Sequence, residues 1–204
     1  MTAPRRSSSY CQCYHLSVSR AGFVLAGGKS SRMGRDKALL PFRGSTLAGH
    51  VAAAVAAAAG SVVLVGDPEK YARLGYPVLP DRTPGAGPLG GIETAISHTT
   101  ADWNLVLACD MPAVSTDFLR DLLLAAERSQ ADALVPAGPS GRLEPLCAVY
   151  HRRCGATLRH ALESGVRRVT EALHGLRVVT LAVLDGARFE NLNTPEEWAS
   201  HDIQ

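Results

Sequence analysis

Short apolar runs rich in β-branched residues alternate along this chain with longer segments of helical periodicity. The runs at 61–66 and 103–108 are uninterrupted by charge, as in strands buried on both faces of a sheet. Segments such as 115–129 follow, where apolar residues recur at helical spacing behind a capping serine. Because parallel strands need such helical crossovers, the alternation predicts a three-layer α/β/α, Rossmann-like fold with a mostly parallel sheet.

The same patterns give the position of each expected element. Strands are expected at Gly22–Ala26, 61–66, 76–80, 103–110, 132–137, 145–150 and 176–183. Helices are expected from Ser45 or Thr46 to Ala59 and at 68–75, Gly90–His98, 115–129, 152–164, 166–173 and 193–201. Residues 1–20 are polar and lack periodicity, so we expect a flexible N-terminal extension followed by a single domain at 21–204.

Composition and charge exclude several classes of protein. The 204-residue chain has a formal net charge of +2, far below the basic excess of a nucleic-acid-binding protein. It shows no apolar run long enough to span a bilayer and no apolar segment of a secretory signal. Its five cysteines indicate reduced thiols, and Cys11 and Cys13 lack the further ligands that a metal site needs. We therefore expect a cytoplasmic monomer that binds neither nucleic acid nor a membrane.

The stretch "LAGGKSSRMGRDK" at 25–37 joins glycines to cationic side chains directly after an apolar run. Glycines after a strand let backbone N–H groups approach an anion closely. The charge comes from Lys29, Arg32, Arg35 and Lys37. The spacing is not that of a Walker A loop, whose second glycine is followed by lysine. The stretch predicts a polyphosphate site, with a solvated basic loop as the alternative.

A second glycine-rich stretch, "GAGPLGG" at 85–91, has the G-x-G-x-x-G spacing of a dinucleotide-binding loop. Its glycines, Gly85, Gly87 and Gly90, follow one expected strand and precede a helix. Residues 81–84 separate that strand from the glycines, however, so the turn is not the tight one that the fingerprint requires. Nicotinamide binding is therefore the weaker interpretation.

Asp110 closes an apolar run and precedes Met111 and Pro112 at a chain reversal. Ligands of open α/β sheets bind outside the carboxyl ends of the strands, so Asp110 and the loop at 25–37 are expected to face one crevice. Mg²⁺ bound to a triphosphate takes one or two protein carboxylates and keeps several waters. Asp110 is therefore a candidate metal ligand, and capping of the turn before Pro112 is the alternative.

Six stretches, in this order, resemble the molybdenum cofactor guanylyltransferase family. They are "LAGGKSSRMGRDKALLPFRG", "DRTPGAGPLGG", "LACDMP", "EPLCAVY", "SGVRRV" and "NLNTPEEW", and the resemblance covers about residues 22–200. The first stretch alone is typical of a wider superfamily of GT-A-like, nucleotide-diphospho-sugar transferase type, whereas the combination is more specific. Related cytidylyltransferases read LAAG, so Gly27 favours guanine by analogy.

The resemblance implies transfer of GMP from GTP to molybdenum-molybdopterin, with Mg²⁺, and release of pyrophosphate. It implies catalytic roles for Arg32, Lys37 and Asp110, with Asp110 as the metal ligand. It implies nucleotide binding by Leu25, Ala26, Gly27, Gly28, Lys37, Asp81 and Asp110. It implies that the molybdopterin side is lined by Gly87, Gly90, Arg167, Arg168, Asn191 and Asn193. The two arginines as a solvated helix end, and the two asparagines as helix caps, are the alternatives.

Other functions stay open at this point. One is a cytidylyltransferase of the same cofactor, and another is a sugar-1-phosphate nucleotidyltransferase, which the short chain disfavours. A third is a non-catalytic module that binds or carries a nucleotide or cofactor, and it would release no pyrophosphate. The presence of both Lys37 and Asp110 favours an enzyme, with carrier or acceptor proteins of the cofactor as further partners.

Overall fold

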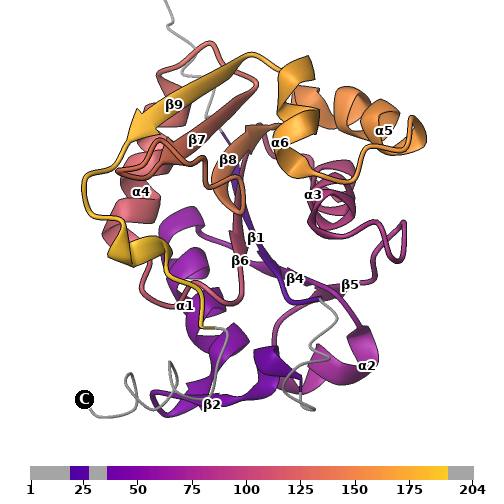
Figure 1. Cartoon of the computed structure of the whole chain (residues 1–204). Coiled ribbons are helices and arrows are strands. Elements are labelled where there is room, and N and C mark those ends of the chain that lie inside the picture. Colours follow the sequence, from indigo (N-terminus) through magenta and orange to yellow (C-terminus); the bar gives the residue numbers. More distant parts are fainter. Residues whose placement is uncertain (1–18, 28–35, 193–204) are drawn as a thin grey trace, which may run out of the picture.

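A seven-stranded sheet forms the middle of the computed structural model, which describes residues 19–27 and 36–192 (Figure 1). Its strands, in spatial order, are β5 (Val78–Leu79), β4 (Val63–Val65), β1 (Arg20–Leu25), β6 (Trp103–Ala108), β8 (Cys147–His151), β7 (Ala133–Ala137) and β9 (Val178–Ala182). Neighbours pair in parallel except at β8, which is antiparallel to β6 and β7. The expected mostly parallel sheet is confirmed.

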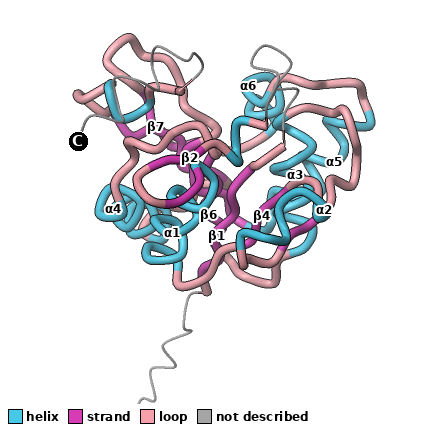
Figure 2. The backbone as a smooth tube through the Cα atoms, turned by 90° about the horizontal axis from the view of Figure 1, so that it is seen from below, coloured by secondary structure: helices cyan, strands magenta, loops and turns pink. Residues whose placement is uncertain are grey.

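Helices cover both faces of the sheet, which gives the three expected layers. One face carries α1 (Leu47–Ala59) and α4 (Thr116–Glu127), and the other carries α3 (Pro88–His98), α5 (Gly155–Glu163) and α6 (Val169–Ala172). Figure 2 shows α1 and α4 on one side of the central strands and α3 and α5 on the other. None of the helices in the described ranges is long and apolar enough to cross a membrane.

Smaller elements connect these layers. They are a hairpin of β2 (Pro41–Phe42) and β3 (Ser45–Thr46), the helix α2 (Pro68–Tyr71), and the 3-10 turns η1 (Lys37–Leu39), η2 (Ala72–Leu74), η3 (Arg152–Cys154), η4 (Leu173–Gly175) and η5 (Ala187–Phe189). The expected helix at 193–201, together with Cys11 and Cys13, lies outside the described residues.

The central strands are buried on both faces. In β6, Leu105 and Leu107 belong to the apolar core shared with α1 and α4, whereas Val106 belongs to the core shared with α3 and α5. All residues of β6 are buried. This explains why the sequence of β6 reads as one apolar run rather than as an alternation.

Local sequence patterns predicted several helix ends correctly. Thr46, one of the two expected caps, accepts a hydrogen bond from Gly49 N at 3.1 Å and begins α1. Gly60 ends that helix with φ of 81°. The expected cap Ser115 accepts a hydrogen bond from Phe118 N at the start of α4.

Several expected boundaries differ from the structure by two or three residues, and two of them lie at the candidate site. α3 begins at Pro88 rather than Gly90, because Gly87 turns the chain with φ of 70° and proline suits a first helical turn. β6 ends at Ala108 rather than Asp110, because Met111 N donates back to Ala108 O and so closes a turn. Asp110 therefore lies in the turn beyond the strand.

Candidate active site

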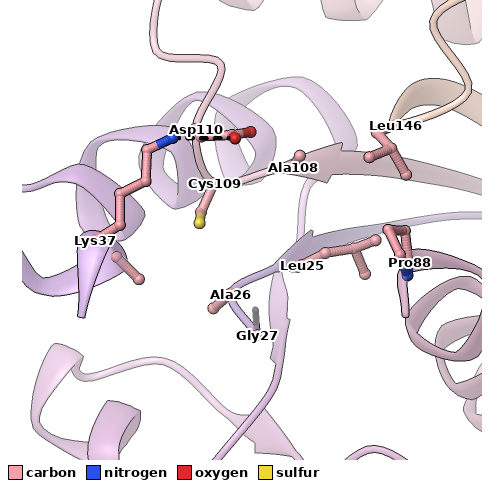
Figure 3. A pocket seen from close by; sticks show the side chains of 10 residues that line it. Leu25, Ala26, Gly27, Lys37, Pro88, Ala108, Cys109, Asp110 and Leu146 are labelled. Carbon is pink, nitrogen blue, oxygen red and sulfur yellow. Dashed lines mark hydrogen bonds and ion pairs between the residues drawn. The ribbon is translucent and has the colours of Figure 1, made fainter. Parts of the chain in front are cut away.

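A cavity of about 180 Å³, here called the first cavity, opens at the carboxyl ends of β1 and β6 (Figure 3). These strands are parallel neighbours, with Leu25 paired to Ala108 at their ends. The cavity is lined by Leu25, Ala26, Gly27, Lys37, Ala38, Pro88, Ala108, Cys109, Asp110 and Leu146. It lies where ligands of open parallel sheets bind.

An ion pair between Lys37 and Asp110 forms one end of the first cavity. Lys37 Nζ lies 3.1 Å from Asp110 Oδ2, and the two side chains are 13% and 25% exposed. Figure 3 shows the lysine reaching from η1 toward the carboxylate beyond β6. A cation and an anion side by side in a partly shielded site can together hold a phosphate and its counter-ion.

The hydroxyl of Tyr71 ties together the two residues that flank the glycine-rich loop. Tyr71 Oη lies 2.6 Å from Ala26 O and 2.9 Å from Asp36 Oδ2. Asp36 in turn accepts from Ala38 N and caps η1, which begins at Lys37. The buried tyrosine thus fixes both the end of β1 and the start of the segment that carries Lys37.

Gly66 is required by the approach of this tyrosine ring. A Cβ at position 66 would lie 2.7 Å from Tyr71 Cε2, closer than side-chain carbons pack. The same Cβ would lie 3.4 Å from Gly27 N. Gly66 therefore has a packing role beside the first cavity.

Asp81 lies beside Gly27, and the family resemblance assigns nucleotide binding to both residues. A Cβ built on Gly27 would be 3.5 Å from Asp81 Oδ2. Burial raises the pKa of the Asp81 carboxyl above its usual value. A half-buried carboxyl of this kind is suited to accept hydrogen bonds from a ribose or a base.

The loop that follows Asp81 is anchored by a buried charge on α3. Glu93 is 2% exposed and lies 3.1 Å from Arg82 and 3.2 Å from Arg159. Arg82 N also donates to Thr94 Oγ1 at 3.0 Å. These bonds fix the loop that leads to Gly87 and Pro88, and Pro88 lines the first cavity.

Cys109 lines the first cavity but is unsuited to act as a nucleophile. Burial, aided by the negative charge of Asp110, raises the pKa of its thiol to about 12. The thiol is therefore protonated near neutral pH, and the thiolate is the reactive form of cysteine. Chemistry in this cavity is better carried by groups on bound substrates.

A second cavity of about 450 Å³ adjoins the first and shares Pro88 and Leu146 with it. Both shared residues lie at the end of the first cavity away from Lys37 (Figure 3). The remaining lining residues are Met111, Arg142, Leu143, Glu144, Pro145, Arg167, Arg168, Val169, Thr170 and Asn191. An apolar floor with several arginines at its walls suits an anionic, partly aromatic ligand.

The candidate residues named from the sequence divide into four groups. Leu25, Ala26, Gly27, Lys37, Asp81 and Asp110 lie at or beside the first cavity, and Arg167, Arg168 and Asn191 line the second. Gly87 precedes the shared Pro88, whereas Gly90 is buried in α3, where a Cβ would lie 2.8 Å from Ala86 Cβ. Gly28, Arg32 and Asn193 lie outside the described residues.

Sequence reasoning gave no role to three polar residues at these cavities. Tyr71 is one, and nothing local in "PEKYARLG" indicates where its hydroxyl reaches. Glu144 and Arg142 are the others, although Glu144 stands in the stretch "EPLCAVY" and so was available as a signal.

The donors at the first cavity fit a Mg²⁺ ion that arrives with a nucleotide. Within 19–27 and 36–192, no three histidine, cysteine or acidic side chains cluster as a complete metal site. Asp110 is the carboxylate that lines the first cavity. One carboxylate together with substrate phosphates is a usual way for proteins to hold Mg²⁺.

This fold brings a lysine of η1 and a carboxylate just beyond β6 to one cavity, an arrangement suited to a nucleotide-dependent transferase. The family model of the MobA-like NTP transferase domain matches residues 22–178. The chain therefore belongs to this family and is a nucleotidyltransferase, which confirms the expected family and leaves no need for a nicotinamide loop at 85–91.

Known proteins resemble the chain over most of its length. It is 36% identical, over 86% of its own length and 90% of the relative's, to a Deinococcus radiodurans protein named "Probable molybdenum cofactor guanylyltransferase". It is 28% identical to the solved molybdopterin-guanine dinucleotide biosynthesis protein A of Archaeoglobus fulgidus, with a TM-score of 0.76 over 89% of this chain and 96% of that one. A Thermus thermophilus 2-C-methyl-D-erythritol 4-phosphate cytidylyltransferase, 19% identical with a TM-score of 0.66 over 90% and 98%, shares the fold.

Proposed function

We propose that this protein transfers GMP from GTP to molybdenum-molybdopterin and releases pyrophosphate. The observation that carries the proposal is the pair of adjoining cavities, one with Lys37 and Asp110 and one with Arg167 and Arg168. A transferase needs a donor site and an acceptor site whose reacting groups meet. The names of the relatives from Deinococcus radiodurans and Archaeoglobus fulgidus support guanine and molybdopterin as the substrates.

The reaction needs no protein nucleophile. The terminal phosphate oxygen of molybdopterin attacks the α-phosphorus of GTP, a new P–O bond forms, and the bond to the leaving pyrophosphate breaks. The protein aligns the two substrates and stabilises the charge that develops on the phosphates. Lys37 binds the phosphates at the first cavity and stabilises their negative charge, and Arg32 is proposed to do the same.

Asp110 would hold Mg²⁺ in this reaction. The ion, when bound, neutralises phosphate charge and links the triphosphate to the protein. Ala26 and Gly27 present backbone groups to the nucleotide, and Asp81 accepts hydrogen bonds from the guanosine part. Gly87 and Asn191 border the acceptor side, to which the family resemblance also assigns Gly90 and Asn193. The resemblance assigns Gly28 to the nucleotide.

The remaining expectations about cell context belong to the same proposal. We infer that the protein works as a monomer in the cytoplasm and passes its product to carrier or acceptor proteins of the cofactor. A gel-filtration measurement with light scattering tests the monomer. A stable dimer at micromolar concentration would contradict it.

Pyrophosphate release is the measurement that tests the function. The full-length protein is incubated with Mg²⁺, molybdenum-loaded molybdopterin and either GTP or CTP. Release with GTP and little release with CTP is expected. Preference for CTP would identify a cytidylyltransferase, and nucleotide binding without release would identify a non-catalytic module.

A further inference from the structure

The second cavity contains one buried carboxylate, that of Glu144, to which the proposed reaction has given no task. Glu144 is 8% exposed. It lies on the segment between β7 and β8, where its backbone N–H donates to Pro136 O and its carbonyl accepts from Cys147 N. The backbone is therefore fixed, and the side chain stands at the wall of the cavity.

The described side chains give this carboxylate one ion pair. Its one ion-pair partner among the described side chains is Arg142, whose Nε lies 3.4 Å from Oε1 and whose side chain is 77% exposed. Burial raises the pKa of Glu144, and the charge of Arg142 opposes that rise in part. Within the described residues, this mostly buried carboxylate, 11% exposed at its side chain, has one long contact to a solvated arginine and so has room for further hydrogen-bond donors.

The rest of the cavity defines the chemistry of a ligand that would supply these donors. The other charged groups of its lining are arginines, Arg142, Arg167 and Arg168, which suit an anionic end of a ligand. Met111, Leu143 and Val169 are apolar and suit a flat ring. A carboxylate can accept one hydrogen bond from a ring N–H and a second from an adjacent exocyclic amine. Guanine and pterins both carry this pair of donors.

We propose that Glu144 recognises the N–H and amine edge of the pterin ring of the acceptor, and so determines specificity in the second cavity. This inference rests on the proposed function. The pterin is favoured over guanine because the nucleotide residues Gly27 and Asp81 lie together at the first cavity. The acceptor phosphate then lies toward Pro88 and Leu146, where the two cavities meet.

Binding of a fluorescent pterin to full-length protein, with GTP and Mg²⁺ present, tests the inference. Glu144→Gln keeps the size of the side chain but turns one acceptor into a donor that faces a donor of the ligand. Pterin affinity should fall about tenfold or more, as expected for two charge-assisted hydrogen bonds. GTP affinity should stay within about twofold, since guanine binds elsewhere.

Two further variants control for charge and for folding. Glu190→Gln makes the same chemical change on an exposed residue of a neighbouring hollow that also includes Glu144, and it should leave pterin affinity within about twofold of wild type. Glu144→Asp keeps the charge and should bind pterin more tightly than Glu144→Gln. Thermal melting of each variant separates loss of the ligand contact from loss of the fold.

The possible results separate this inference from the proposed function. Equal pterin affinity in wild type and Glu144→Gln overturns the inference and leaves the function intact. A parallel loss of GTP affinity in Glu144→Gln also overturns it, because the residue would then act on guanine or on folding. A wild-type protein that binds no pterin and releases no pyrophosphate overturns both.

Discussion

Lys37 and Asp110 are 73 positions apart in the sequence, and their ion pair brings the two halves of the site to one cavity. A surface ion pair would contribute little, but this pair is largely shielded from water. Both partners line the first cavity, where a triphosphate is proposed to bind. We therefore expect the pair to affect catalysis more than stability.

Replacing Asp110 by Asn tests its role as a metal ligand. The amide can still accept a hydrogen bond from Lys37, so the melting temperature should change little. Turnover should fall by about 10²-fold or more, because the charge that Mg²⁺ requires is gone. GTP affinity, measured with and without Mg²⁺, should become nearly independent of the ion. A variant that keeps turnover and Mg²⁺ dependence would make Asp110 a capping residue.

Tyr71→Phe removes the hydroxyl that ties Ala26 to Asp36 and keeps the ring that packs against Gly66. The expected loss of stability is about 1 kcal/mol, as for one hydrogen bond. The KM for GTP should rise several-fold while the KM for molybdopterin stays constant, because Ala26 and Asp36 flank the loop that is proposed to bind the nucleotide. Tyr76→Phe, at a partly exposed tyrosine, is the control. Melting that falls with an unchanged KM for GTP would make Tyr71 purely structural.

At the scale of elements, one partly buried carboxylate joins the last strands to η3. Asp132, 16% exposed, precedes β7 and accepts from Arg177 at the start of β9 and from Arg153 in η3. Arg177 N donates to the same carboxylate at 3.0 Å. These arginines hold the pKa of Asp132 well below its usual value. The edge of the sheet away from the site thus depends on one ionised group.

This depressed pKa predicts how stability changes in acid. The stabilisation is fully present above the unfolded-state pKa of about 3.9, and it is lost as the pH falls toward the lower pKa of the folded state, because the unfolded chain then binds the proton more readily. Urea unfolding at pH 5, 4 and 3 should show a steeper loss for wild type than for Asp132→Asn. Equal slopes would show that Asp132 is not coupled to folding.

At the scale of the whole molecule, local patterns were enough to predict the layers and most caps. Thr46, Ser115 and Gly60 act on neighbours within four residues, so the sequence around them carries the signal. The contacts of Tyr71 and Glu144 could not be predicted in this way. Tyr71 reaches Ala26 across 45 positions, and the burial of Glu144 depends on how the cavity walls assemble. Such features arise from packing between elements.

Contacts of Ser19 and Arg20 show which N-terminal residues of the described chain pack against the rest of the fold. Ser19 O accepts from Trp103 N at 3.1 Å, and Ser19 Oγ accepts from Asp102 N at 3.1 Å. Arg20 begins β1 and pairs with Glu127 through two hydrogen bonds of 2.5 and 2.7 Å. Ser19 and Arg20, the last two residues of the expected extension of 1–20, thus contact the rest of the described chain.

Deletion of residues 1–18 should therefore leave folding and pyrophosphate release unchanged, with a melting temperature within about 2 °C of wild type. Deletion of residues 1–20 removes the bonds of Ser19 and the ion pair of Arg20 as well. A loss of about 2 kcal/mol would lower melting by roughly 4–8 °C in a chain of this size. Equal melting of both deletions would show that Arg20 contributes nothing to stability. A large loss in the shorter deletion would show that residues 1–18 belong to the folded domain.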